Sequence, residues 1–156
     1  MSIFPTRILL ATDGSEDAKL AVRTAVELGQ KTGSQLRVVY VGGEGFYETP
    51  LVELATSEAT SIAREYSDLV SDIERTEREL LDEEVDKVLA AGGRVTQTHL
   101  SMGKAAPEIV VVAEEIGAGL IVMGSTGQGG IRKALLGSVS ESVIKHAHCP
   151  VLVVRE

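Results

Sequence analysis

The residues with the clearest chemical potential form a glycine-rich stretch near the C-terminal end of the chain. An apolar run over 120–123 leads into Gly-Ser-Thr-Gly-Gln-Gly-Gly over 124–130, and a helical pattern follows, with Gly137-Ser138 inside it or just before it. A buried strand that runs into glycines and then a helix presents backbone N–H groups to a phosphate. Glycine suits this position because a side chain blocks close approach and because some N–H directions require positive φ. The stretch predicts a phosphate-binding loop; the alternative is an ordinary glycine-rich turn.

Two common phosphate-binding patterns do not fit this stretch. The P-loop requires Lys directly after its second glycine, and no Lys follows these glycines. The dinucleotide pattern G-x-G-x-x-G fails because Arg132 stands where its third glycine is needed. The spacing that does occur is Gly124, two residues, Gly127, nine residues, Gly137 and then Ser138.

This spacing resembles the nucleotide motif of the ATP-binding branch of the universal stress protein family. Ile8–Ser15 resembles the family's opening strand and acidic turn, and His148–Val154 resembles its closing strand. The resemblance covers nearly the whole chain except roughly 42–71. It implies one domain over 1–156 that contains a five-stranded parallel sheet of order 3-2-1-4-5. It also implies a homodimeric, ATP-binding regulatory or stress-response protein that takes its nucleotide with Mg or Mn.

The chain alternates predicted strands and helices, which indicates right-handed β-α-β crossovers and a doubly wound parallel α/β sheet between helical layers. Apolar runs predict strands over 7–12, 35–41, 120–123 and 151–154. The segment over 94–100 alternates between two faces, which predicts a strand near a sheet edge. Ser15 is a good N-cap for a first helix, whose end is marked by Gly29 and Gly33. Gly103 and Pro107 frame the predicted start of a later helix, and another helix is predicted to follow the glycine loop and to run through Ile144. The length of 156 residues suits a single domain.

One predicted helix, over 57–91, is long and highly charged. Ile62, Tyr66, Leu69 and Ile73 fall at helical spacing within it. Because it is longer than a compact domain requires, we expect it to project beyond the sheet or to kink. Its charge run is typical of a solvated face, and a partner-binding surface is the alternative. The preceding segment over 42–56 is predicted to be a loop, with ligand contact as the alternative.

In the 3-2-1-4-5 order, the first and fourth strands are neighbours at the point where the strand order reverses. Ligands of such sheets bind outside the carboxyl ends of these strands. Ala11, Thr12 and Asp13 end the first strand, and Met123 and Gly124 end the fourth, so we expect them to meet at one crevice. The Asp13 carboxylate is predicted to accept hydrogen bonds from ribose or to hold the nucleotide's metal ion. Its alternative role is to cap the first helix.

The resemblance assigns further roles at this crevice. Val41 offers backbone groups to adenine, while Ser138 and Ser140 donate hydroxyl hydrogen bonds to phosphate oxygens. Thr126 stands where family members often carry a basic or imidazole side chain, which weakens the expected γ-phosphate contact. Arg132 either neutralises phosphate with Lys133 or is solvated. No catalytic residue is predicted, and the predicted nucleotide site consists of Ala11, Thr12, Asp13, Val41, Met123, Gly124, Thr126, Gly127, Gly137, Ser138, Val139 and Ser140.

Composition narrows the classes of partner. The net charge of −8 and an aromatic content of 3% disfavour nucleic acids and anionic membranes. The single Cys149 allows no intramolecular disulfide, and the scattered His99, His146 and His148 do not suggest a transition-metal site. The first residues show no signal-peptide pattern, and no apolar run approaches the ~20 residues of a membrane span, so a cytoplasmic location is expected.

Three functions remain open: a nucleotide-binding regulator that acts on unidentified protein partners, a slow nucleotide hydrolase or other adenine-nucleotide-using enzyme, and a dimer without nucleotide. Adenylating enzymes carry a Ser-Gly-Gly-rich loop after their first strand, and Ala-Thr-Asp-Gly-Ser over 11–15 does not match it. Fast hydrolysis needs a residue that positions water and a fixed cation, and only Gln128 and Arg132 are candidates in the loop. The strand over 151–154 is apolar on both faces, which predicts a homodimer through this edge.

Overall fold

The computed structural model describes residues 2–43, 57–127 and 136–156, without the side chains of 57–59. Five parallel strands form one sheet of order β3-β2-β1-β4-β5. The strands are β1 (Arg7–Thr12), β2 (Gln35–Gly42), β3 (Val95–Met102), β4 (Leu120–Gly124) and β5 (Val151–Val154). The helices are α1 (Glu16–Thr32), α2 (Ser57–Ala90), α3 (Ala105–Glu115) and α4 (Ser138–His146). The predicted α/β class and strand order are confirmed, and the strand bounds agree with the sequence prediction to within two residues.

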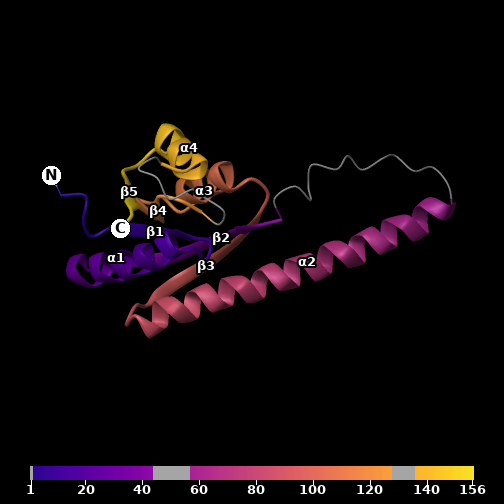
Figure 1. The fold of residues 1–156 in the computed structure, drawn as a ribbon, viewed down its shortest axis with the longest axis horizontal. Coiled ribbons are helices and arrows are strands. Elements are labelled where there is room, and N and C mark those ends of the chain that lie inside the picture. The colour runs from indigo at the N-terminus through magenta and orange to yellow at the C-terminus, as the bar shows by residue number, and fades with distance from the viewer. Residues whose placement is uncertain (1, 44–56, 128–135) are drawn as a thin grey trace.

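Helices cover both faces of the sheet (Figure 1). One core cluster joins β1 residues Ile8 and Leu10 to buried residues of α1 and α2, including Ala21 and Leu81. On the other face, Leu9 of β1 packs in a second cluster with residues of α3 and α4. Alternate residues of β1 therefore enter the two cores, which is why this central strand is a continuous apolar run.

Helix α1 begins where the sequence predicts and ends at Gly33, the second of the two glycines predicted to mark its end. The Ser15 Oγ accepts a hydrogen bond from the Ala18 N–H at 3.2 Å, which caps the first turn. Gly33 is the C-cap, with φ of 67°, and its N–H donates to the Gly29 carbonyl. Gly29 therefore lies inside the helix, and the prediction that it marks the end is wrong. The left-handed conformation at Gly33 terminates the helix because glycine adopts it without steric cost.

Helix α2 confirms the prediction of a long helix that projects beyond the sheet (Figure 1). Its buried side chains are Leu81, Glu84 and Val88, all in its last third, where it packs against β3, β2 and α1. The loop predicted over 42–56 lies outside the described residues from position 44 onward. Among the helices of the described segments, none has the length and apolar character needed to cross a membrane.

Candidate functional site

A pocket of about 350 Å³ lies at the carboxyl ends of β1 and β4, where the strand order reverses. This volume is within the roughly 300–1,000 Å³ of small-molecule sites. All twelve residues of the predicted nucleotide site line it. Six further lining residues were not predicted: Ser15, Ala18, Val39, Ala105, Ile109 and Ser125.

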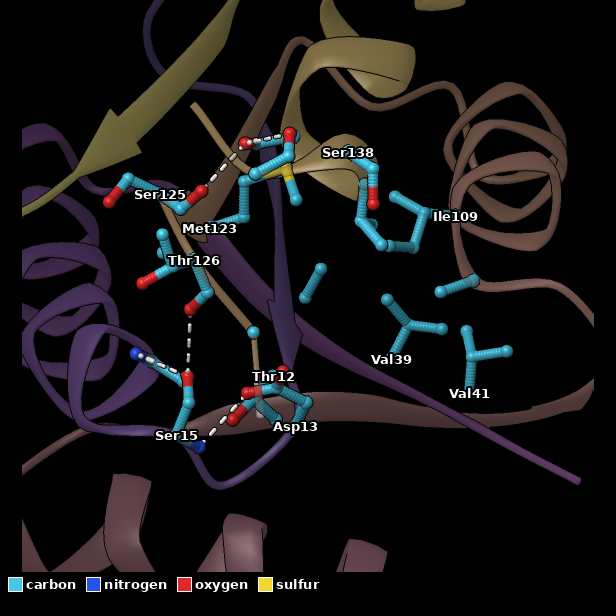
Figure 2. Close-up of a pocket in the computed structure, with 18 residues that line it drawn as sticks. Thr12, Asp13, Ser15, Val39, Val41, Ile109, Met123, Ser125, Thr126 and Ser138 are labelled. Carbon is cyan, nitrogen blue, oxygen red and sulfur yellow. Dashed lines mark hydrogen bonds between the residues drawn. The ribbon is translucent and has the colours of Figure 1, made fainter. Parts of the chain in front are cut away.

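The pocket has one apolar side and one polar side. Figure 2 shows Val39, Val41 and Ile109 grouped on one side, with Asp13, Ser15 and Thr126 across the cavity from them. The β2 alternation would have indicated Val39, because it shares a strand face with Val41. Ile109 and its neighbour Ala105 come from α3, and no local sequence signal connects them with the glycine loop.

The Asp13 carboxylate lies between the start of α1 and the glycine loop. Its Oδ1 accepts a hydrogen bond from the Ser15 N–H at 2.9 Å, across a turn in which Gly14 has φ of 78°. Ser15, with its own hydroxyl, supplies the cap of α1. On the loop side, a Cβ built on Gly127 would lie 2.7 Å from Asp13 Oδ2. Asp13 is therefore held against the loop at the polar end of the pocket.

Asp17, which was not among the predicted site residues, holds the first part of the glycine loop. Its Oδ2 accepts hydrogen bonds from Ser125 Oγ at 2.6 Å, Thr126 Oγ1 at 2.8 Å and the Thr126 N–H at 3.2 Å. Both hydrogen-bond donors of Thr126 are thus directed at Asp17. Thr126 lines the pocket, but neither its hydroxyl hydrogen nor its N–H is presented to a ligand.

The two ends of the described glycine segment are joined by hydrogen bonds. The Gly137 N–H donates to the Ser125 carbonyl at 2.7 Å, and the buried Ser140 Oγ lies 2.8 Å from the same carbonyl and 3.0 Å from the Gly137 carbonyl. The single hydroxyl hydrogen of Ser140 is used within the chain. The predicted phosphate contacts of Ser138 and Ser140 stay predictions, and the Ser140 hydroxyl would have to leave these carbonyl oxygens to donate to a phosphate.

Two of the three motif glycines, Gly124 and Gly137, are required by close contact with the backbone of other segments. A Cβ on Gly124 would lie 2.8 Å from the Asp17 carbonyl carbon and 2.9 Å from Ala18 N, and one on Gly137 would lie 2.9 Å from the Ser125 carbonyl oxygen. None of the three is among the described glycines with positive φ. These three glycines therefore do not adopt the positive φ that was expected at some positions of the loop. Gly124 and Gly137 are needed because a Cβ would fill the space between the chain segments that meet there.

On the opposite face of the sheet, α2 is tied to the ends of β1 and β2. The Thr12 hydroxyl donates to Glu84 Oε2 at 2.5 Å, and the Gly43 N–H donates to Glu77 Oε1 at 3.1 Å. Burial raises the pKa of Tyr40 to about 12, with further contributions from the Glu77, Asp13 and Glu84 carboxylates. Tyr40 is therefore a neutral phenol at physiological pH, and the Thr12 side chain serves this network.

Asp13 is the only ionisable residue among those that line the pocket in the described part of the chain. The candidate groups Gln128, Arg132 and Lys133 lie outside the described residues. Within 2–43, 57–127 and 136–156, no cluster of three or more His, Cys, Asp or Glu side chains is arranged to hold a metal ion. Burial raises the pKa of the half-buried Cys149 thiol, which packs against the second core cluster.

Known proteins share both the sequence and the fold. The universal stress protein MJ0531 of Methanocaldococcus jannaschii is 35% identical over 150 residues, which are 96% of this chain and 82% of that protein. The solved structure of hypothetical protein MJ0577 superposes with a TM-score of 0.75 at 26% identity, covering 98% of this chain and 97% of the other. A universal stress protein solved in complex with cAMP has the same fold, with a TM-score of 0.68 at 23% identity, covering 99% of each chain.

The chain also matches the sequence model of a whole protein family. The family model of the universal stress protein family (Usp) matches residues 5–155. This range includes all five strands and both sides of the pocket. Together with the 3-2-1-4-5 sheet and the 35% identity to a curated relative, this match shows that the chain belongs to the universal stress protein family.

Proposed function

We propose that this chain is a regulatory protein that binds an adenine nucleotide, ATP with Mg or Mn, in the pocket at the ends of β1 and β4. The observation that carries the proposal is the division of this pocket into an apolar side and a glycine-loop side at the point of strand reversal. The cAMP complex of a protein with this fold supports an adenine nucleotide as the ligand class.

The base and the ribose suit different parts of the pocket. Val39, Val41 and Ile109 offer an apolar wall for adenine, and the carboxyl end of β2 brings the Val41 backbone to its edge. Asp13 lies across the cavity, where its carboxylate can accept hydrogen bonds from ribose hydroxyls. This arrangement places the sugar between the apolar wall and the glycine loop.

The phosphates suit the start of α4 and the glycine loop. Gly137 is the N-cap of α4 and makes no side-chain cap, so the first N–H groups of the helix, from Ser138 and Val139, are not satisfied by a capping side chain. Such N–H groups favour an anion. Gly127 leaves the approach to Asp13 open. As the alternative to the ribose contact, Asp13 would hold a divalent cation together with the phosphates, and the cation's charge would offset the repulsion between an anionic ligand and a chain of net charge −8.

The proposed regulator is a homodimer through β5. This strand is at the edge of the sheet, and Leu152 on it is exposed. A two-fold axis would pair β5 with its copy in antiparallel orientation, which covers the free edge. Sedimentation should give a dimer at micromolar concentration. A monomer, or a Val153→Lys variant that keeps the wild-type mass, would contradict the proposal.

Mass spectrometry of the purified and then denatured protein tests the ligand class directly. We expect ATP or another adenine nucleotide to be released, and binding by calorimetry to weaken when EDTA removes the divalent ion. Asp13→Ala should cost roughly 1.5–3 kcal/mol, about ten- to a hundredfold in affinity, because a charge-assisted contact is lost. Glu16→Ala, at an exposed position three residues away, is the matched control. Equal affinities of the two variants for ATP would show that Asp13 does not contact the nucleotide.

A further inference from the structure

Helix α2 carries an apolar stripe that includes three exposed side chains. Ile62, Leu69 and Leu80 are 52%, 50% and 37% exposed. Eighteen residues are five full turns, so Ile62 and Leu80 lie on one line along the helix, and Leu69 is only about 20° from it. The half-buried Tyr66 and Ile73 lie on the same face. Single exposed apolar residues are common on proteins, but a continuous stripe requires an explanation.

The stripe lies mainly on the part of α2 that extends beyond the sheet (Figure 1). Over 60–80, none of the described side chains is buried, and the first buried one is Leu81. The core-facing side of α2, at Leu81, Glu84 and Val88, is rotated by roughly 40–100° from the line through Ile62 and Leu80. The core contact therefore adjoins the stripe around the helix, and its buried residues lie C-terminal to the exposed residues of the stripe.

A row of acidic side chains runs along the side of the stripe away from the core contact. The row lies roughly 60–120° from the line through Ile62 and Leu80. All its members are exposed, and they are Glu65, Asp68, Asp72, Glu79, Glu83 and Asp86. Asp72 also pairs with Arg75 at 3.0 Å. The whole helix contains eleven Asp and Glu against four Lys and Arg, a net −7, whereas the chain carries −8 in total.

We propose that the stripe and the acidic row together are a docking surface for another protein, whose contact segment is an amphipathic helix with a basic edge. The apolar face of such a helix would cover Ile62, Leu69 and Leu80, as in helix-to-helix recognition. Its Lys or Arg residues would face the acidic row and select this orientation. The surface is distinct from the nucleotide pocket and serves a different ligand.

Charge decides between this partner and others. A second copy of the chain would bring a helix of net −7 against another of net −7, and antiparallel pairing would set the two acidic rows on the same side. Nucleic acids and anionic membranes are repelled by the same charge. A basic protein segment is the occupant that satisfies both the stripe and the row.

Two synthetic helical peptides of roughly 18 residues, equal to five turns, provide the probe. Both carry Leu at the same stripe positions, and their flanks carry either Lys or Glu. Fluorescence anisotropy with the full-length protein should show binding of the Lys peptide only, and raising the salt to about 0.5 M should weaken it through screening. Binding of neither peptide, or equal binding of both, would overturn the proposal.

Substitutions separate the stripe from general surface effects. Ile62→Gln with Leu69→Gln should weaken the Lys peptide at least about tenfold, as for loss of interface anchors. Leu89→Gln is the matched control, because Leu89 is also 52% exposed and lies on the opposite side of α2. Circular dichroism should show unchanged helix content in both the double variant and the control. Equal loss with the control, or no loss with the pair, would contradict the proposal.

Charge reversal tests the selectivity. Glu65→Lys with Glu79→Lys should weaken the Lys peptide and admit the Glu peptide, whereas Glu74→Lys with Asp82→Lys, at exposed positions outside the row, should not change the preference. Two results would assign the stripe to another occupant and overturn the proposal. One is self-association that Ile62→Gln abolishes. The other is binding of the Lys peptide only after residues 44–56 are replaced by a Gly-Ser linker, which would identify this segment of the chain as the occupant of the stripe.

Discussion

Asp17→Ala is the sharpest test of how the pocket is built. The Asp17 Oδ2 accepts three hydrogen bonds, from the side chain of Ser125 and from the side chain and N–H of Thr126. The substitution leaves the hydroxyl of Ser125, a residue that is 5% exposed, without its acceptor. A hydrogen bond to a charged group contributes roughly 1.5–3 kcal/mol, and three bonds to one oxygen are not additive.

The net effect follows from the remaining terms. Alanine improves helix propensity by at most ~0.7 kcal/mol, and loss of the carboxylate from the first turn of α1 costs ~0.3–1 kcal/mol, so these two terms nearly cancel. We expect Asp17→Ala to lower the free energy of unfolding by about 2 kcal/mol. With a urea m-value of about 2 kcal/mol/M, the unfolding midpoint should fall by roughly 1 M.

Glu16→Ala is the control, because Glu16 lies in the same turn, is exposed and pairs with Lys19 at the surface. It should change stability by less than about 0.5 kcal/mol. If ATP binds as proposed, Asp17→Ala should weaken ATP roughly tenfold more than adenosine, since only the phosphates use the loop that Asp17 holds. A midpoint shift equal to that of Glu16→Ala would refute the inferred role of Asp17.

Three further predictions test other parts of the structure. Gly124→Ala should destabilise the fold by about 1–3 kcal/mol in urea titrations, because its Cβ would meet the Asp17 and Ala18 backbone; unchanged stability would contradict the packing described. Burial, and then the charge of Arg37, lower the pKa of His99 below 6.5. As the pH falls, the unfolded chain therefore binds this proton before the folded chain does, and the free energy of unfolding should fall as the pH drops through 6.5. His99→Gln should flatten this part of the curve of stability against pH, and an unchanged curve would refute the prediction. ATP turnover measured by phosphate release with Mg²⁺ should stay below about 1 s⁻¹, and faster release would favour the hydrolase alternative.

The parts of the fold that follow from local pattern were predictable. The apolar run of β1, the Ser15 cap and the charged periodicity of α2 each have a signature within a few residues of the chain. The family resemblance supplied the strand order, which periodicity alone does not determine. With that order, the ends of β1 and β4 had to meet, and the residues there line one pocket.

The tertiary structure decided how those residues are used. Asp17 and Thr126 are 109 positions apart, and Thr12 and Glu84 are 72 apart, so neither hydrogen bond leaves a local signal. The same is true of Ser140, whose hydroxyl looked available until packing placed it beside the Ser125 carbonyl. By itself the sequence determined the order of elements and the position of the glycine loop, because both depend on neighbouring residues. Which donors remain for a ligand was decided only by contacts between distant segments, because each polar group has few hydrogen bonds to give and packing selects their partners.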